Sequence, residues 1–205
     1  MDARGVLQLD WGAGATAFGR RLPIAYNDAA NEISARQKAL SAKDCARVVQ
    51  LGDARPPVAA GLERGNAVEY RTSTIAWIEP DADAQWLYHR IAVLFQEANR
   101  RYGFELQGLV EALQYTVYGP GDKFDWHADL GPGTTSGRKL SMSILLSPDE
   151  DYDGGHLEFL DGGTRTGVQA GTAVFFPSYM AHRVAPITRG VRRSLVAWAY
   201  GPTFR

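Results

Sequence analysis

His127 and Asp129 stand two positions apart inside a short run of residues with the composition of a strand. Because residues i and i+2 of a strand face the same side, this spacing would point an imidazole and a carboxylate into one space. One further histidine would complete a 2-His-1-carboxylate triad, a ligand set that leaves positions open on iron(II) for other molecules. The same spacing also arises by chance in surface pairs, so the rest of the chain must support a metal site.

Two histidines could supply the third ligand. His182 follows an apolar run and a turn, which would place it at the start of a strand inside the β-rich region. His156 directly follows a Gly-Gly pair, where a histidine is more often exposed to solvent. His89 falls on a predicted helix and is expected at the surface. These placements favour His182.

Arg192 and Ser194 form a second pair at strand spacing. A buried guanidinium beside a hydroxyl is a good receptor for a carboxylate, because its planar fork donates two parallel hydrogen bonds. Arg193 would face the opposite side of the strand. Arg189 and Arg193 are expected to form only a basic edge.

The C-terminal part must position these groups, and it is rich in short β-type runs separated by Gly, Pro and Asp turns. Many short strands at such spacing predict a sandwich or barrel, and a double-stranded β-helix (jelly roll) of about eight strands over residues 109–201 fits best. The predicted strands are Leu113–Tyr118, Phe124–Ala128, Leu140–Leu146, Leu157–Leu160, Ala173–Phe176, His182–Ile187 and Ser194–Tyr200.

The N-terminal part predicts supporting helices, which makes the fold class α+β. Ser41 and Asp44 form a capping box that would start a helix, with Gly52 as its stop. Asp81 could cap a second helix that ends before Gly103. Its apolar face would consist of Leu87, Ile91, Leu94, Phe95 and Ala98, and a strand, Thr72–Ile78, would precede it. Residues 41–205 are therefore expected to form one domain, and residues 1–40 have no assigned role.

Composition limits the possible partners. The 205 residues are 45% hydrophobic and carry a formal net charge of -1, which suits a globular domain and gives no basic surface for nucleic acid. Cys45 is the single cysteine, so an internal disulfide is impossible and a reducing compartment is favoured. No apolar run of signal-peptide or membrane-span length is found. We expect a cytoplasmic protein that binds no membrane, and its oligomeric state stays open.

Taken together, these motifs resemble the iron(II)/2-oxoglutarate-dependent oxygenases of the prolyl 4-hydroxylase type, in particular the PKHD-type hydroxylases. The resemblance runs from about residue 113 to residue 201. It rests on Tyr118-Gly-Pro-Gly-Asp, His127-x-Asp129, Leu140-Ser141 leading to Leu145-Leu146-Ser147, Tyr152-x-Gly154-Gly155-x-Leu157, Phe176-Pro177-Ser178 and His182-x-Val184-x-Pro186-Ile187-Thr188-x-Gly190-x-Arg192-x-Ser194.

The resemblance implies roles for matching positions. His127, Asp129 and His182 would be the iron ligands, and Arg192 would bind the distal carboxylate of 2-oxoglutarate. Further contacts with this co-substrate are implied for Ser194, Tyr118, Leu145 and Leu157. The implied cofactors are iron(II), 2-oxoglutarate and O₂, with ascorbate as an optional reductant.

The implied reaction is hydroxylation of an unactivated C–H bond of a peptidyl residue, an amino acid or a related small metabolite, with 2-oxoglutarate decarboxylated to succinate. The alternative is a non-catalytic metal-binding jelly-roll sensor or binding module, which would not need the carboxylate receptor at Arg192. A nucleic-acid demethylase of the same superfamily is disfavoured by the net charge and by Trp198, where those enzymes carry a second arginine.

Four side chains are candidates for contacts with the substrate. Trp77 and Trp126 could contact it, although a core position suits each equally well. Arg71 and Arg138 could bind a substrate carboxylate, but a solvated surface position is expected for both. The loop 131–137 has the composition of either a mobile lid or a plain connector.

Overall fold

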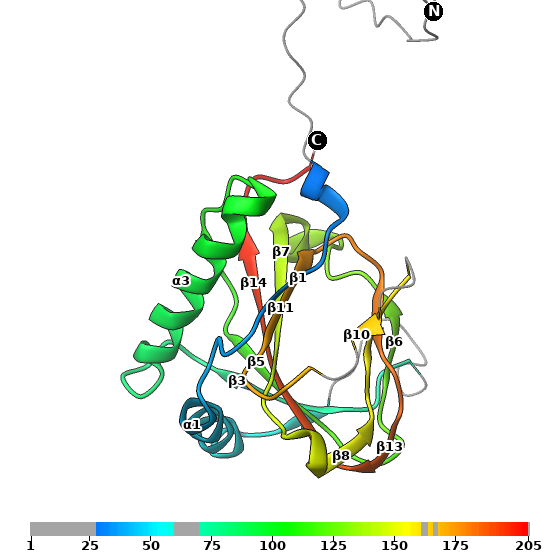
Figure 1. Cartoon of the computed structure of the whole chain (residues 1–205). Coiled ribbons are helices and arrows are strands. Elements are labelled where there is room, and N and C mark those ends of the chain that lie inside the picture. The colour runs from blue at the N-terminus through cyan, green and yellow to red at the C-terminus, as the bar shows by residue number, and fades with distance from the viewer. Residues whose placement is uncertain (1–27, 60–69, 161–163, 166–167, 205) are drawn as a thin grey trace, which may run out of the picture.

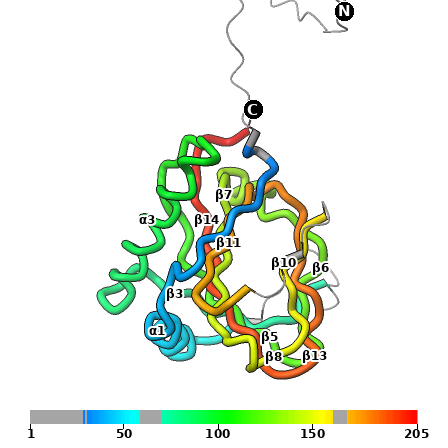
Figure 2. The backbone as a smooth tube through the Cα atoms, viewed as in Figure 1, coloured from blue at the N-terminus to red at the C-terminus, as the bar shows by residue number. Residues whose placement is uncertain are grey.

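The computed structural model describes residues 28–59, 70–160, 164–165 and 168–204. Within them, antiparallel strands form two sheets that face each other around a common interior (Figures 1 and 2). The larger sheet follows the order β1-β11-β7-β14-β5-β3-β2, and β4 pairs with β14. Its strands are β1 Ser34–Arg36, β2 Val58–Ala59, β3 Thr74–Ile78, β4 Gly108–Leu109, β5 Leu113–Tyr118, β7 Arg138–Leu145, β11 Ala173–Pro177 and β14 Arg192–Tyr200.

The smaller sheet has the order β10-β9-β12-β6, and a separate pair joins β13 to β8. Short 3₁₀ helices occur at the edges of the β region. The bounds are β6 Phe124–His127, β8 Tyr152–Gly154, β9 Leu157–Phe159, β10 Thr164–Arg165, β12 His182–Val184 and β13 Ile187–Gly190, with η1 Asp28–Asn31, η2 Gly133–Gly137 and η3 Asp149–Asp151. The predicted jelly roll is confirmed.

Helix α1, Ala42–Asp53, begins with the predicted capping box. The Ser41 hydroxyl accepts a hydrogen bond from the Asp44 N–H, and the Asp44 carboxylate accepts one from the Ser41 N–H. The prediction that Gly52 stops this helix is wrong, since the helix runs on to Asp53. A Cβ at Gly52 would lie 2.3 Å from ring carbons of Tyr115, so glycine is required there for packing.

Helix α3, Gln85–Tyr102, ends as predicted, with Gly103 in the left-handed conformation at a φ of 65°. Asp81 is not its N-cap: that position belongs to Ala84. The Asp81 carboxylate instead accepts a hydrogen bond from the Ala84 N–H and closes the turn before the helix. The predicted apolar face is buried, apart from the half-buried Ala98.

Both helices cover the outer face of the larger sheet, opposite β6, β8, β10 and β13 (Figure 1). The residues of β7 and β14 that join the helices in one apolar cluster are Leu140, Met142, Ile144, Leu195, Ala197 and Ala199. A second cluster lies inside the barrel, and its members are Tyr118, Leu157, Phe159, Val174, Phe176, Val184 and Ile187. On the face of the sheet that lines the barrel interior, β7 and β14 also carry buried polar residues, namely Ser141, Arg192 and Ser194.

One predicted strand needs correction, and residues 34–36 add a strand that was not predicted. The run His182–Ile187 is not one strand: β12 ends at Val184, and β13 begins at Ile187 in a different pairing. Pro186 separates them, and proline cannot donate to a strand ladder. In addition, β1 pairs with β11 at the sheet edge, so residues 34–36 take part in the larger sheet. Residues 1–27 lie outside the described part of the chain.

None of the helices in the described ranges is long and apolar enough to cross a membrane.

Candidate active site

Strand pairing in the smaller sheet brings together three side chains from distant parts of the sequence. His182 at the start of β12 lies opposite His127 at the end of β6. Asp129 lies two residues after His127, beyond the end of β6 and one residue past the predicted strand Phe124–Ala128. One ligand atom from each of the three lies within 4.8 Å of the others. His156 and His89 are exposed.

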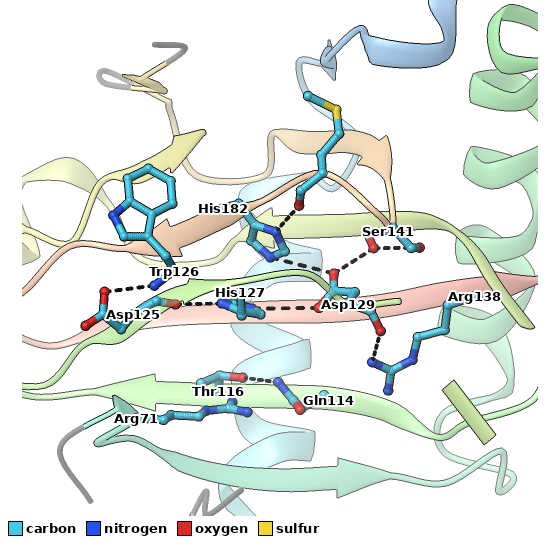
Figure 3. Close-up of polar contacts among 12 residues, drawn as sticks. Arg71, Gln114, Thr116, Asp125, Trp126, His127, Asp129, Arg138, Ser141 and His182 are labelled. Atoms are coloured by element: carbon cyan, nitrogen blue, oxygen red, sulfur yellow. Dashed lines mark hydrogen bonds and ion pairs between the residues drawn. The ribbon is translucent and has the colours of Figure 1, made fainter. Parts of the chain in front are cut away.

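Hydrogen bonds orient both imidazoles. His127 Nδ1 lies 2.8 Å from the Asp125 carbonyl oxygen, and His182 Nδ1 lies 2.9 Å from the Met180 carbonyl oxygen (Figure 3). A carbonyl can only accept, so each Nδ1 donates, which leaves Nε2 as the nitrogen that can bind a metal. The Nε2 atoms lie 3.8 Å and 3.6 Å from the two oxygens of Asp129. All three donor groups thus face one point.

Two buried serines form a hydrogen-bonded chain that ends on the Asp129 carboxylate. Ser141 Oγ donates a 2.6 Å hydrogen bond to Asp129 Oδ2, and Ser178 Oγ lies 2.9 Å from Ser141 Oγ. Both serines are fully buried. Their roles were not predicted from the sequence, although the alternation of Ser141 with apolar neighbours on β7 marks it as an interior polar residue.

The electrostatics of the cluster suit a cation. Burial, reinforced by the nearby His182, lowers the pKa of His127 to about 4. Burial alone would raise the pKa of Asp129, but the two histidines and the Ser141 hydroxyl hold that pKa below its ordinary value. At neutral pH His127 is therefore neutral and Asp129 is charged, which is the protonation state that a metal requires.

Arg192 lies deeper in the barrel, on β14, opposite Tyr118 of β5. Only 4% of its surface is exposed. Its Nη1 donates a 3.2 Å hydrogen bond to Ser194 Oγ, and its Cζ lies 5.6 Å from the centre of the Tyr118 ring. Among the described residues, Arg192 forms no ion pair.

Arg192 lines a cavity of about 280 Å³. This volume is near the lower end of the range for ligand pockets, roughly 300–1,000 Å³. Leu145 and Leu157, which the sequence placed beside the co-substrate, also line it, together with Ser143, Tyr152 and Val174. Asp149, Asp153 and His156 also line the cavity, so its wall is mixed rather than apolar. Arg192 is the buried cation of this lining, and its guanidinium suits a molecule that carries a carboxylate.

Arg193 points to the other side of β14, as strand alternation predicts. It is half-buried rather than part of an exposed basic edge, and it interacts with Tyr115 on the helix side of the sheet. Arg189, by contrast, is exposed, and its Nε donates to Asp153 at 2.6 Å.

Arg138 and Arg71 were expected at a solvated surface, and for both residues this expectation is wrong. Arg138 forms a 2.6 Å ion pair with Glu111, donates to the Asp129 carbonyl oxygen at 3.1 Å and lies 3.7 Å above the Trp198 ring. Arg71 is also largely buried, against Phe124. Both corrections come from contacts between segments that are far apart in the sequence.

The two tryptophans considered as substrate contacts, Trp77 and Trp126, are half-buried. The loop 131–137 contains η2, in which Thr135 Oγ1 donates to the Pro132 carbonyl oxygen. Gly137 is buried, and its carbonyl oxygen accepts a 2.9 Å hydrogen bond from the Gly201 N–H. The far end of the loop is thus fixed to the C-terminal segment.

Comparison with known proteins gives matches to the C-terminal part of the chain. The family model for the 2OG-Fe(II) oxygenase superfamily matches residues 113–200. A PKHD-type hydroxylase from Synechococcus sp. strain CC9902 is 41% identical over 81 residues, which cover 38% of this chain and 36% of the relative. A PKHD-type hydroxylase from Klebsiella pneumoniae is 34% identical over 97 residues, 43% of each chain. This chain spans less than half the length of these curated relatives.

Solved structures of prolyl hydroxylases share the fold. A prolyl-4-hydroxylase from Pseudomonas putida has a TM-score of 0.67 at 24% identity, over 85% of this chain and 95% of that one. A prolyl hydroxylase from Trichoplax adhaerens, in complex with a hypoxia inducible factor oxygen degradation domain peptide fragment, has a TM-score of 0.68 at 20% identity, over 83% and 84%. These likenesses show the jelly-roll fold of 2-oxoglutarate oxygenases.

The superfamily implies iron(II), 2-oxoglutarate and O₂ as cofactors and co-substrates. Two imidazoles and one carboxylate are the donor set that suits iron(II) with open positions, and His127, Asp129 and His182 all lie inside the matched segment. Residues 113–200 thus match the 2OG-Fe(II) oxygenase superfamily, and this part of the chain is similar to PKHD-type hydroxylases.

Proposed function

We propose that this chain is an iron(II)- and 2-oxoglutarate-dependent hydroxylase that acts on an unactivated C–H bond. The observation that carries the proposal is the combination of a metal-type triad with a buried arginine that has no anionic partner among the described residues. Arg192 shares its cavity with Leu145 and Leu157. A site that binds only a metal would have no use for an arginine buried in the barrel, because an uncompensated buried charge is costly.

His127, Asp129 and His182 would hold the iron. Their Nδ1–carbonyl hydrogen bonds fix each ring, and Ser141 fixes the carboxylate, so little rearrangement is needed on binding. Bound iron(II) with 2-oxoglutarate and O₂ supplies the oxidising chemistry, which the protein side chains cannot supply themselves. The chain's own part is to orient the reactants and to exclude water.

Arg192, Ser194 and Tyr118 would receive the distal carboxylate of 2-oxoglutarate. The guanidinium offers a planar donor fork, and Ser194 Oγ already lies within hydrogen-bond distance of it. Because strand pairing places Tyr118 opposite Arg192, the phenol is positioned to donate to the same carboxylate. Leu145 and Leu157 would confine the carbon chain between this end and the metal.

Apolar residues enclose the metal end of the barrel. The ring of Phe176 lies 4.5 Å from the ring of His182, and Phe159 lies 6.0 Å from it. Both phenylalanines belong to the buried interior cluster. Such walls exclude water from the reacting centre, which protects it from side reactions.

The substrate classes that remain are a peptidyl residue, a free amino acid and a related small metabolite. The Trichoplax adhaerens neighbour holds a peptide fragment, which supports the first class by analogy of fold. The alternative function, a metal-binding sensor, predicts that 2-oxoglutarate neither binds nor is consumed.

The test is succinate formation by the purified protein with iron(II), 2-oxoglutarate and O₂, screened against amino acids and peptides. Mass spectrometry then identifies any product that has gained one oxygen atom. We expect substrate-stimulated succinate formation in the wild type and none in His127→Ala. A wild-type protein that binds iron(II) but neither binds nor consumes 2-oxoglutarate would support the sensor instead.

A further inference from the structure

Arg71 is a second interior arginine near the metal-type triad. It precedes β3 and pairs with Phe124 of β6 in an isolated antiparallel bridge. Its Nε donates a 2.9 Å hydrogen bond to Ser73 Oγ, and its Cζ lies 4.4 Å from the centre of the Phe124 ring. Ser73 and Phe124 therefore fix the plane of the guanidinium.

One nitrogen of that guanidinium is unsatisfied, although the Tyr118 hydroxyl lies within hydrogen-bonding reach of the group. Arg71 Nη2 is buried and has no hydrogen-bond partner among the described residues. Leaving a buried charged donor unpaired costs free energy, and such a group usually has a ligand or a functional reason. Burial lowers the pKa of Arg71, but a guanidinium remains protonated at all ordinary pH values.

Two other half-buried arginines, Arg138 and Arg183, have carboxylate partners. Arg138 pairs with Glu111 at 2.6 Å and Arg183 with Glu158 at 2.7 Å. Within the described ranges, neither Arg71 nor Arg192 has a carboxylate partner. On the barrel side of the sheet, the described residues thus include two guanidinium groups without a carboxylate partner, Arg192 deep in the barrel and Arg71 close to the triad.

The position of Arg71 relative to the triad follows from Phe124. That ring stacks on the His127 imidazole at 3.5 Å between centroids, and the Arg71 guanidinium lies over the same ring. Asp129 and Tyr118 both interact electrostatically with Arg71. Figure 3 shows the Arg71 side chain extending beneath His127. An anion held by Arg71 would therefore lie beside the metal ligands.

Under the proposed function, 2-oxoglutarate already has partners for both of its carboxylates. Arg192 and Ser194 would receive the distal group, and the proximal group would lie at the metal. Arg71 is then available to a different molecule. We propose that Arg71 is the receptor for a carboxylate of the primary substrate, so that the substrate class is an organic acid whose reacting C–H bond lies near that carboxylate. This inference rests on the proposed function.

The experiment compares matched probes that differ only in charge. Mn(II)-loaded protein saturated with 2-oxoglutarate is titrated calorimetrically with a panel of N-acetyl-L-amino acids and with the primary amide of each. The variants are Arg71→Gln, which removes the charge, and Arg71→Lys, which retains it without the fork. The control is Arg183→Gln, since Arg183 also lies over an aromatic ring, that of Trp126, but already has Glu158 as partner.

We expect at least one acid to bind and its amide to bind at least about tenfold more weakly, the scale of one lost charge-assisted hydrogen bond. Arg71→Gln should abolish this preference, Arg71→Lys should keep part of it, and Arg183→Gln should keep all of it. The affinity for 2-oxoglutarate alone should be the same in Arg71→Gln and in the wild type.

Several results would overturn the inference: no acid binds, amides bind as tightly as acids, or Arg71→Gln keeps the preference. Weaker 2-oxoglutarate binding by Arg71→Gln would assign Arg71 to the co-substrate instead. In each of these cases wild-type binding of Mn(II) and 2-oxoglutarate remains, so the proposed function stands. A wild type that binds neither would overturn both proposals together.

Discussion

On β7 and β14, the side chains that face the helices are mainly apolar, with Arg193 as an exception, whereas those that face the barrel include serines and the buried Arg192. Leu140, Met142 and Ile144 alternate with Ser141 and Ser143 along one strand. Residues on the two faces are equally inaccessible in several cases: Ile144 and Ser141 are both 0% exposed. The difference between the faces is therefore one of chemistry and not of burial.

This difference shows where stability and function lie in the molecule. Burying apolar side chains against α1 and α3 stabilises the fold, while burying hydroxyls and a guanidinium costs free energy unless they find partners. Inside the barrel those partners are the triad, each other and, under the proposed function, bound ligands. Substitutions on the two faces should consequently have separable effects, on stability for one face and on binding for the other.

The largest effect is expected at the triad. His127→Ala, Asp129→Ala and His182→Ala should each lower the affinity for iron(II) by more than about 100-fold, because losing a direct ligand exceeds the 10- to 100-fold cost of losing an outer partner. Anaerobic titration with iron(II) measures this. His156→Ala and His89→Ala are the controls, since both side chains are exposed. If His156→Ala lost iron binding and His182→Ala kept it, the third ligand would have been assigned to the wrong residue.

On the helix-facing side, Ile144→Ala should reduce the free energy of unfolding by about 2–5 kcal/mol, since it leaves a cavity in the core. Its affinity for iron(II) should match that of the wild type once the protein is folded. Chemical denaturation and metal titration of the same sample give both quantities. Ser143→Ala, the neighbouring residue on the cavity side, should change stability by less than about 0.5 kcal/mol. Equal destabilisation by the two substitutions would contradict the separation of the faces.

Arg192 and Arg193 are adjacent on β14 but face opposite sides of the sheet, so they allow the barrel side and the helix side to be compared directly. Arg192→Ala should weaken 2-oxoglutarate binding on the order of 100-fold with iron(II) still bound, and Arg192→Lys should restore only part, because an ammonium lacks the planar fork. Anaerobic titration of 2-oxoglutarate, followed by the metal-to-ligand absorption band, measures this. Arg193→Ala should leave that affinity unchanged but lower stability by about 1 kcal/mol, as its contact with Tyr115 is lost. Equal affinities in Arg192→Ala and the wild type would remove Arg192 from the co-substrate site.

Local patterns in the sequence predicted the elements that are governed by local physics. The capping box at Ser41 and the glycine stop at Gly103 depend only on neighbouring residues, and both were correct. Strand Leu113–Tyr118 has the predicted bounds, because alternation and turn residues define it. The His127–Asp129 pair also depended on spacing of two residues, although Asp129 lies beyond the strand.

Contacts between distant segments were not predictable in this way. Burial of Arg138 depends on Glu111, 27 residues earlier, and the support of Asp129 depends on Ser141, 12 residues later. Gly52 was predicted to end helix α1, because glycine often ends helices. Its role is instead to leave room for the ring of Tyr115 on β5. A single sequence does not state which segments meet, so polar residues whose partners are remote are readily mistaken for surface residues.

The smallest effect is expected in loop 131–137, which links the metal-binding segment to β7. Pro132 and Thr134 are exposed, whereas Gly137 is buried and hydrogen-bonded to Gly201. We predict that the double substitution Pro132→Ala and Thr134→Ala leaves the affinities for iron(II) and 2-oxoglutarate unchanged. The reason is that η2 is held by its own hydrogen bonds and by Gly137, none of which involves these two side chains.

The same variant decides between a connector and a lid. A connector leaves succinate and hydroxylated product in a one-to-one ratio, and this is the result we expect from the anchored η2. A lid would exclude water from the reacting centre through its exposed tip, so altering the tip would produce succinate in excess of product. Quantifying both products in one reaction mixture distinguishes the two. An excess of succinate, with unchanged affinities for iron(II) and 2-oxoglutarate, would show that loop 131–137 acts as a lid. The loop would then contribute to function, as the barrel-facing side chains do.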